Sequence, residues 1–244
     1  MKRFVFDTAD TANVTDFGNG EWSLNLNHQI TCSKLVITNI IIPHTFYNVN
    51  KSNNEMKIVS ITKPPLIGMV IETIKLDERY MNYNDLESHT NEIDIGGVKK
   101  IECTFNKKTF KWTFKRLLPE IDSIEFTTSY KLYGFKKGIN YAFDAITNEV
   151  VSPNVADMNS IPAIYIRCNQ IHSKCVYNNN RTSILHRLPV DKPFGQLITY
   201  QNTSTDMFIN QENINYLQFS LTDNKGTHID LNGADWKIEM LLLD

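Results

Sequence analysis

Strict alternation of apolar and polar residues constrains the fold of this chain more than any other feature of its sequence. Within residues 216–222 every second side chain is apolar, and residues 236–243 repeat the pattern after a turn-forming Asp223-Asn224-Lys225-Gly226. Successive side chains of a β-strand point to opposite faces, so each run predicts a strand with one buried face. The intervening residues are typical of a turn. The C-terminal end of the sequence therefore predicts two strands of a sheet.

The same reasoning predicts strands through most of the sequence. Alternating or β-branched runs occupy residues 3–7, 22–26, 34–42, 55–61, 68–76, 101–105, 109–115, 123–127, 163–168, 182–188 and 196–200. Residues 8–20 and 136–160 have the composition of loops. Residues 82–93 predict a short amphipathic helix, and residues 129–135 a single further turn of helix. The pattern is that of a mainly β protein with one helical region.

The predicted strands fall into two groups separated by a mixed middle. Four lie within residues 22–77 and five within 161–244, which is close to the eight strands of a two-sheet jelly roll. We therefore predict an all-β fold, a single jelly-roll β-sandwich with an inserted small α+β subdomain. In this division residues 1–77 are an N-terminal arm and the first half of the jelly roll. Residues 78–160 are the insertion and residues 161–244 the second half.

The net charge and the hydropathy of the chain argue against nucleic acid and membranes as partners. The formal net charge of −2 over 244 residues argues against binding nucleic acid through bulk electrostatics, so no nucleic-acid specificity is expected. The longest apolar stretch, residues 35–43, is about half of what a membrane-spanning helix needs. The N-terminus lacks an apolar run of signal-peptide length, so neither a membrane span nor secretion is expected.

No residue pattern indicates catalysis. The six histidines stand singly, none at the i, i+4 spacing of a helical zinc site, and no serine or cysteine lies in a nucleophile motif. The four cysteines (Cys32, Cys103, Cys168, Cys175) are scattered, which suggests reduced, partly buried thiols in an intracellular or intravirion protein. We expect no enzymatic activity, no cofactor and no metal.

Some polar and aromatic groups have two readings. Asp223, Asp230 and Asp235 suggest calcium, but turn chemistry explains them more simply. Trp236 is expected to plug the core rather than contact a ligand. The aromatic face of residues 110–114 (Phe110, Trp112, Phe114) resembles a base-stacking platform, yet with this net charge it is expected to be the inner face of the insertion.

Several segments together resemble a known protein family. They are residues 22–26 (WSLNL), 35–49 (LVITNIIIPHTFYNV) with Asn53-Asn54, 130–135 (YKLYGF), and 217–223 (LQFSLTD) with Gly226 and 229–236 (IDLNGADW). The predicted helix at 82–93 and the hairpin ending at Phe114 belong to the same resemblance. These segments resemble the minor capsid (penton) proteins of virophages and of Polinton or adintovirus-type elements. The resemblance extends from about residue 22 to 243.

The resemblance implies a viral structural protein. It implies a single jelly roll that forms a homopentamer at the icosahedral five-fold vertices, beside a double jelly-roll major capsid protein. The expected partners are further copies of the chain and that capsid protein. The expected location is the virion, after synthesis in the host cell cytoplasm. A receptor- or carbohydrate-binding β-sandwich, such as a spike or fibre head, is the alternative.

A candidate subunit interface follows the apolar strand at residues 34–42. Pro43, Phe46, Tyr47 and Asn48 come directly after it, and loop aromatics are frequent anchors between subunits. The competing reading is that these residues cover the open end of the sandwich.

Overall fold

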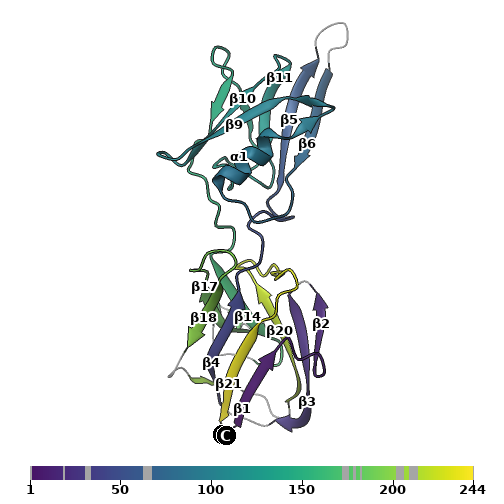
Figure 1. Ribbon diagram of the computed structural model, residues 1–244, viewed down its shortest axis with the longest axis vertical. Helices are drawn as coiled ribbons and strands as arrows, with labels where there is room; N and C mark the ends of the chain where they lie inside the picture. Colours follow the sequence, from purple (N-terminus) through teal and green to yellow (C-terminus); the bar gives the residue numbers. More distant parts are fainter. Residues whose placement is uncertain are drawn as a thin grey trace. The chain divides into compact units, whose positions relative to one another are not determined.

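The computed structural model divides the chain into two compact units. The jelly-roll unit comprises Met1–Phe46 and Ile161–Asp244, and the inserted unit comprises Tyr47–Ser160. Figure 1 shows the strands of both units. The structure describes residues 2–18, 20–30, 34–62, 68–171, 176–177, 180–181, 183–201, 206–208 and 214–243.

The jelly-roll unit contains two antiparallel five-stranded sheets. The first has the order β1-β21-β4-β18, with β19 also paired to β4, and the second has the order β17-β14-β20-β3-β2. Their bounds are β1 Lys2–Asp7, β2 Val14–Gly18, β3 Glu21–Ile30, β4 Lys34–Pro43, β14 Ala163–Cys168, β17 Ile184–Pro189, β18 Leu197–Gln201, β19 Asp206–Phe208, β20 Ile214–Thr222 and β21 Lys237–Leu243. A separate two-stranded ladder joins β15 (Val176–Tyr177) to β16 (Asn180–Arg181).

The strand order identifies the fold of this unit. If β1, β3, β4, β14, β17, β18, β20 and β21 are numbered one to eight in chain order, one sheet reads 1-8-3-6 and the other reads 5-4-7-2. This is the order of an eight-stranded jelly roll, in which antiparallel neighbours come from distant parts of the chain. The predicted fold class is confirmed. The inserted unit leaves the jelly roll between its third and fourth strands, β4 and β14.

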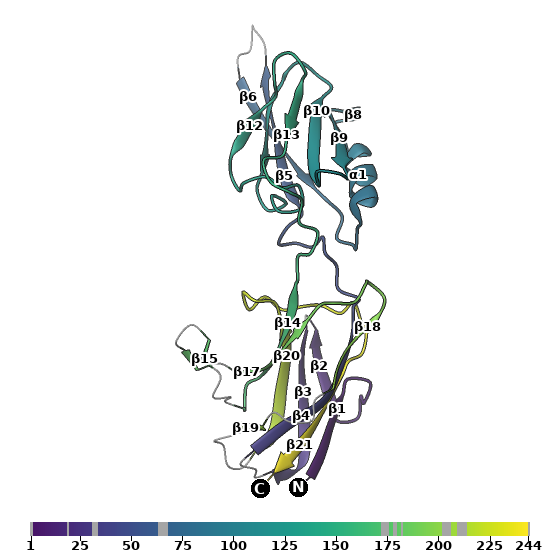
Figure 2. The ribbon, with the colours of Figure 1, turned by 90° about the vertical axis from the view of Figure 1, so that its left-hand side faces the viewer.

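The two sheets bury one continuous apolar core between them. In β21 the burial alternates from Lys237 to Leu243 as the sequence pattern predicts. At the centre, Phe6 lies 4.5 Å from Phe219 and 5.1 Å from Trp236, ring centre to ring centre, and Trp22 lies 5.5 Å from Trp236. Trp236 is 1% exposed, which confirms its predicted place in the core. Such aromatic contacts add to the burial term that holds two sheets together. Figure 2 shows the two sheets from the side.

The inserted unit is a second, smaller sandwich with one helix. Its sheets have the orders β12-β11-β5-β6 and β13-β10-β9, and a hairpin joins β7 to β8. The bounds are β5 Glu55–Thr62, β6 Gly68–Lys75, α1 Tyr83–Asn91, β7 Asp94–Ile95, β8 Val98–Lys99, β9 Ile101–Asn106, β10 Lys111–Arg116, β11 Ile121–Phe126, β12 Asn140–Ala142 and β13 Glu149–Val151. Its apolar core is separate from that of the jelly roll.

The first boundary of the insertion differs from the prediction. The predicted strands at 55–61 and 68–76 belong to the jelly roll in the predicted division, but β5 pairs with β11, and Met56, Ile58 and Ile74 are buried in the core of the inserted unit. The insertion therefore starts at Tyr47, not at residue 78, whereas its end at Ser160 agrees with the prediction. An alternating pattern predicts a strand but not its partner, which explains the error.

Local sequence signals account for the helix. Asn82 caps α1, since its side chain accepts hydrogen bonds from the backbone N–H groups of Asn84 and Asp85. The Asp85 carboxylate accepts in return from the Asn82 N–H at 3.1 Å, which completes a capping box. The predicted helix over 82–93 is thus confirmed to within two residues.

The segment predicted as a turn of helix at 129–135 is one turn closed by a glycine. The Phe135 N–H donates to the Tyr130 carbonyl at 2.8 Å, and the Gly134 N–H donates to Lys131 at 3.1 Å. Gly134 has φ +73°. Together these bonds make a Schellman motif, which requires a left-handed residue at this position. The Leu-Tyr-Gly-Phe sequence is therefore a helix-stop signal.

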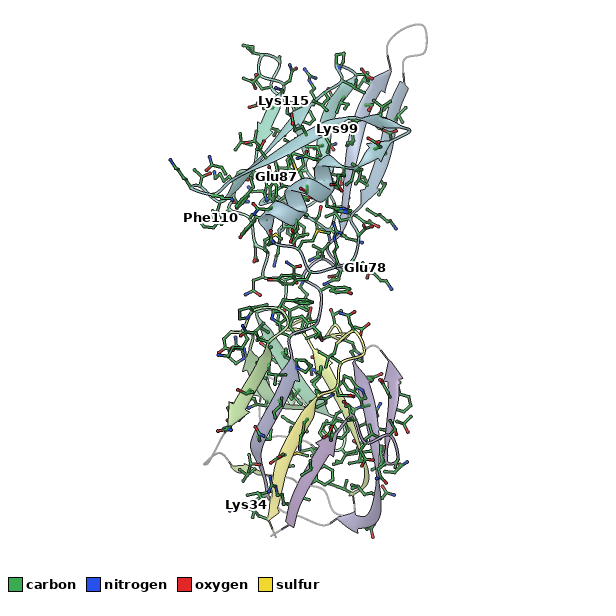
Figure 3. All side chains as sticks on the ribbon, viewed as in Figure 1. Lys34, Glu78, Glu87, Lys99, Phe110 and Lys115 are labelled. Atoms are coloured by element: carbon green, nitrogen blue, oxygen red, sulfur yellow. The ribbon has the colours of Figure 1, made fainter. Side chains whose placement is uncertain are left out.

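The aromatic face of the β9–β10 hairpin is only partly as predicted. Trp112 and Phe114 are fully buried, but Phe110 lies in the turn with φ +54° and is 49% exposed. Its side chain points outward at the tip of the hairpin (Figure 3). The short strands β2, β12 and β13 fall in segments predicted as loops: β12 and β13 have three residues each, too few to show a period, and β2 lies in a stretch of turn-forming residues.

Candidate functional site

The candidate interface begins where β4 ends. Pro43 closes β4 opposite Leu197 of β18. The next residue is fixed by its backbone: the His44 N–H donates to Gln196 at 2.8 Å, and the Gly195 N–H donates to the His44 carbonyl at 2.8 Å. The His44 Nδ1 atom lies 2.7 Å from the Lys192 carbonyl oxygen. This segment is therefore bound to the loop that precedes β18.

A second loop of the jelly roll is bound to the same segment. The Thr45 hydroxyl donates to the Leu231 carbonyl at 2.6 Å, and the Asn232 side-chain amide donates to the Thr45 carbonyl at 2.6 Å. The end of β4 thus joins the loops before β18 and before β21. Phe46 completes this end, because it is 4% exposed and its ring lies 4.4 Å from that of His44.

Asn48 has a corresponding role in the inserted unit. Its side-chain amide donates to the carbonyls of Met81 at 2.8 Å and Met158 at 3.2 Å, and its Oδ1 accepts from the Met81 N–H at 2.8 Å. The residue is 8% exposed. Because Asn48 and Met158 lie near the two ends of the inserted unit, the amide binds these ends together.

These contacts correct part of the predicted interface. Phe46 and Asn48 are buried within their own chain, so their side chains are not available as anchors for a neighbouring subunit. The burial of Phe46 favours the competing reading, in which aromatic residues here cover the end of the sandwich. Pro43 and Tyr47 are half-buried, and their role at a subunit interface stays a prediction.

Burial raises the pKa of three side chains of the two cores, Cys103, Cys168 and Tyr133. Burial raises the pKa of Cys103 to about 12 and that of Cys168 to about 11, and both are free thiols. The pKa of Tyr133 is also raised well above its usual value by burial, while its hydroxyl lies 2.6 Å from that of Thr90. High thiol pKa values oppose nucleophilic reactivity. Cys32 and Cys175 lie outside the described residues.

The three aspartates considered for calcium bind protein groups. The Asp223 carboxylate accepts from the N–H groups of Lys225 and Thr227, and that of Asp230 accepts from the Asn232 N–H. Asp235 accepts from the hydroxyl of Thr8 at 2.9 Å. In the part of the chain that the structure describes, no three His, Cys, Asp or Glu residues are grouped as metal ligands. Within the same residues, no helix has the length and hydropathy to cross a bilayer.

The structure reveals an exposed apolar surface that the sequence pattern did not distinguish from core. It lies on the β5–β6 hairpin of the inserted unit, with Ile61, Met69 and Ile71 on one face of the sheet and Val70 on the other, and these residues are 46%, 67%, 50% and 43% exposed. We call it the β6 patch. Its residues are β-branched or long and apolar like those of the buried strands, so only the position of β6 at a sheet edge identifies it.

Comparisons with known proteins give a distant structural similarity. No protein-family model matches the sequence, and no curated protein matches it. Among solved structures, the chain is similar to the crystal structure of the selenomethionine-labelled mavirus penton protein, with 11% identity over 98% of each chain and a TM-score of 0.44. Because a TM-score of this size does not establish a shared fold, the assignment as a jelly roll rests on the strand order.

Proposed function

We propose that the protein is a structural subunit of a viral capsid, a penton-type minor capsid protein. In this role it occupies the five-fold vertices as a homopentamer, beside a double jelly-roll major capsid protein. The role is non-enzymatic and belongs to the virion, with synthesis in the host cell cytoplasm. No cofactor takes part.

The observation that carries this proposal is the eight-stranded jelly roll with a complete second unit inserted in one connection. The jelly roll is a fold of viral capsid and lectin domains, and the motif resemblance over residues 22–243 favours the capsid among them. Copies related by rotation close a ring through repeated heterologous contacts. The loops bound to the end of β4 give each copy a firm shape at one end of its sandwich.

The direct test is assembly. Purified protein is examined by light scattering and negative-stain imaging, alone and mixed with the double jelly-roll major capsid protein from the same source. We expect ring-shaped particles of five copies, or incorporation of the protein into shells. A protein that remains monomeric at high concentration and never joins a shell contradicts the proposal. Micromolar binding on a glycan array would instead support a carbohydrate-binding sandwich.

A further inference from the structure

The four-stranded sheet of the inserted unit has two edges that no strand of the described residues covers, β6 and β12. Edge strands present backbone N–H and C=O groups that pair readily with another strand, and proteins usually protect them with charges, prolines or bulges. β6 pairs with β5 in a regular register over eight residues. Its first half carries the exposed Met69, Val70 and Ile71, and its two charged residues, Glu72 and Lys75, form ion pairs within the chain.

The backbone geometry shows which groups face outward. The Leu76 N–H donates to the Asn54 carbonyl at 2.8 Å, so residues 74, 72 and 70 form the next inward pairs with β5. Met69, Ile71 and Thr73 therefore direct their N–H and C=O groups away from the sheet. On the other edge, the Phe143 N–H donates to Asp122 at 3.2 Å, which leaves Asn140 and Ala142 facing outward.

We propose that the β6 edge of one copy pairs with the β12 edge of a second copy, head to tail. Adjacent strands of this sheet are all antiparallel, so β6 and β12 run in opposite directions. When one copy is rotated about an axis along the strands, its β12 continues the antiparallel alternation beside β6 of its neighbour. The same two edges then meet at every contact, as a ring requires. The inference rests on the proposed self-assembly and names the contact.

One register aligns the side chains as well as the backbones. Ile71, Val59, Ser123 and Ala142 already form one row across the sheet, and Thr73, Lys57, Glu125 and Asn140 form the next. Placing Ile71 opposite Ala142 and Thr73 opposite Asn140 continues both rows into the second copy. Outward-facing backbone groups then meet outward-facing groups on both strands.

The same register brings complementary charges together at one end of the new ladder. Lys136 and Lys137 precede β12, and Asp77 and Glu78 follow β6; all four are exposed. Antiparallel pairing directs the end of β6 that carries the carboxylates toward the start of β12 that carries the lysines. Figure 3 shows Glu78 among the outward side chains. Within the chain, Lys75 pairs with Glu55 at 3.1 Å and Glu72 with Lys100 at 2.5 Å, and the Asp77 carboxylate lies 3.7 Å from the His89 Nε2 atom.

At the opposite end of the proposed ladder, apolar side chains of the two copies come together. Met69 would lie opposite Asp144, close to Ile146, which is 90% exposed at the tip of the turn after β12. This turn is firm, because the Asp144 carboxylate accepts from the N–H groups of Ile146 and Thr147 at 2.9 and 2.8 Å. These bonds lower the pKa of Asp144. A preorganised apolar side chain loses little entropy on docking, so Ile146 suits the β6 patch.

The first test places a charge on the edge. Ile71→Lys puts an ammonium group into the proposed ladder, and Val151→Lys is the control, since Val151 is 54% exposed on β13 of the other sheet. We expect Ile71→Lys to weaken self-association about tenfold or more in light scattering, and Val151→Lys to leave it unchanged. Thermal unfolding followed by circular dichroism verifies that both variants fold.

The second test locates the partner strand by cross-linking with a short bismaleimide. The double variant Thr73→Cys with Asn140→Cys is expected to link into multimers larger than dimers, alone or in shells, while the unmodified chain does not. Dimers from Thr73→Cys alone would indicate β6–β6 pairing and overturn the proposal. Full association of Ile71→Lys without cross-links also overturns it but leaves the capsid role standing. An unmodified protein that neither self-associates nor joins a shell overturns both.

Discussion

At the scale of single residues, two buried polar side chains affect stability in ways that their sequence context does not indicate. Asn48 makes three hydrogen bonds to the backbones of Met81 and Met158, and no apolar residue can replace them. A buried backbone group that loses its partner costs more than the bond contributes, because it is not rehydrated. Asn48 is therefore a structural residue of the inserted unit.

We expect Asn48→Ala to lower the free energy of unfolding by about 2–4 kcal/mol, since it leaves one N–H and two carbonyl groups unpaired. Asn84→Ala, at an exposed position of α1, is the control and should change stability by less than about 0.5 kcal/mol. Urea unfolding at several protein concentrations measures both. A loss that appears only as weaker self-association would restore Asn48 as an interface residue.

The second case is Cys103, buried beside the Thr90–Tyr133 hydroxyl pair. Burial raises its pKa from 9.0 to about 12, and the pKa of Tyr133 is raised from 10.0 for the same reason. Above pH 9 the unfolded chain releases these protons while the folded chain retains them. The unfolded state then binds fewer protons, so the free energy of unfolding falls as the pH rises.

We therefore expect stability to decrease between about pH 9 and pH 12, with a slope on the order of 1 kcal/mol per pH unit for each such group. Denaturant unfolding from pH 8 to 11 measures the slope. Cys103→Ala should make the slope shallower, whatever its effect at neutral pH. An equal slope in this variant would show that the thiol is not the group that titrates.

At the scale of elements, α1 protects an edge of the three-stranded sheet. Asn91 donates to the Cys103 carbonyl at 2.9 Å and accepts from the Cys103 N–H at 2.7 Å, as a neighbouring strand would. Glu87 accepts from the Phe105 N–H at 3.0 Å. Figure 2 shows α1 beside β9. The helix thus covers the edge of β9 with side chains, whereas no described strand pairs with the outer edge of β6.

Asn91→Ala should cost about 2 kcal/mol, because both backbone groups of Cys103 lose their partner. Hydrogen exchange provides the sharper measurement. The amides of Cys103 and Phe105 should exchange faster relative to those of β5, and Asn84→Ala should leave them unchanged. Unaltered protection of the Cys103 amide would show that the side chain does not hold this edge.

A second element-scale feature is the close approach at Gly134. A Cβ atom there would lie 2.3 Å from the Asn154 carbonyl oxygen, in addition to the strain of φ +73°. Gly138 has φ +67° but no atom within 4 Å of such a Cβ, which makes it a matched control. The pair separates backbone strain from steric contact.

We expect Gly138→Ala to cost about 1 kcal/mol, from the left-handed conformation alone. Gly134→Ala should cost about 3 kcal/mol or more, because the segment at Asn154 must also move. Thermal unfolding of the two variants measures the difference. Equal costs would mean that the loop at Asn154 yields without penalty.

At the scale of the whole molecule, the inserted unit has the features of an independent domain. It has its own core, and both chain connections lie at Phe46–Tyr47 and Ser160–Ile161. The bond from Asn48 to Met158 holds its two ends together. Adjacent ends are the geometry that allows a domain to be inserted in a loop of another.

We expect residues 47–160, expressed alone, to fold and unfold cooperatively. Trp112 is buried within this unit and its Nε1 donates to the Leu132 carbonyl at 3.2 Å, so its fluorescence reports the native core. Denaturant unfolding of the fragment should show one sigmoidal transition. A fragment without a cooperative transition would show that the jelly roll is needed to fold the insertion.

Much of the local structure follows from the sequence alone. The alternation of apolar and polar residues predicts strands such as β20 and β21. The capping box of Asn82 and Asp85 fixes the start of α1. These signals are local, because the face of a strand and the cap of a helix depend on residues a few positions apart. The segments 8–20 and 136–160 are predicted as loops but contain the short strands β2, β12 and β13. These strands are stabilised by pairing with their partner strands and not by a pattern in their own sequence.

Only the tertiary structure decides which strands pair. The runs at 55–62 and 68–75 look like those of the jelly roll, yet β5 pairs with β11 and β6 pairs with β5, and this places the boundary at Tyr47. It also buries Phe46 and Asn48 while leaving Met69 and Ile71 exposed at an edge. The alternation of apolar and polar residues indicates that a strand has an apolar face. Whether that face meets a core, and whether its edge meets another strand, depends on residues far away in the chain.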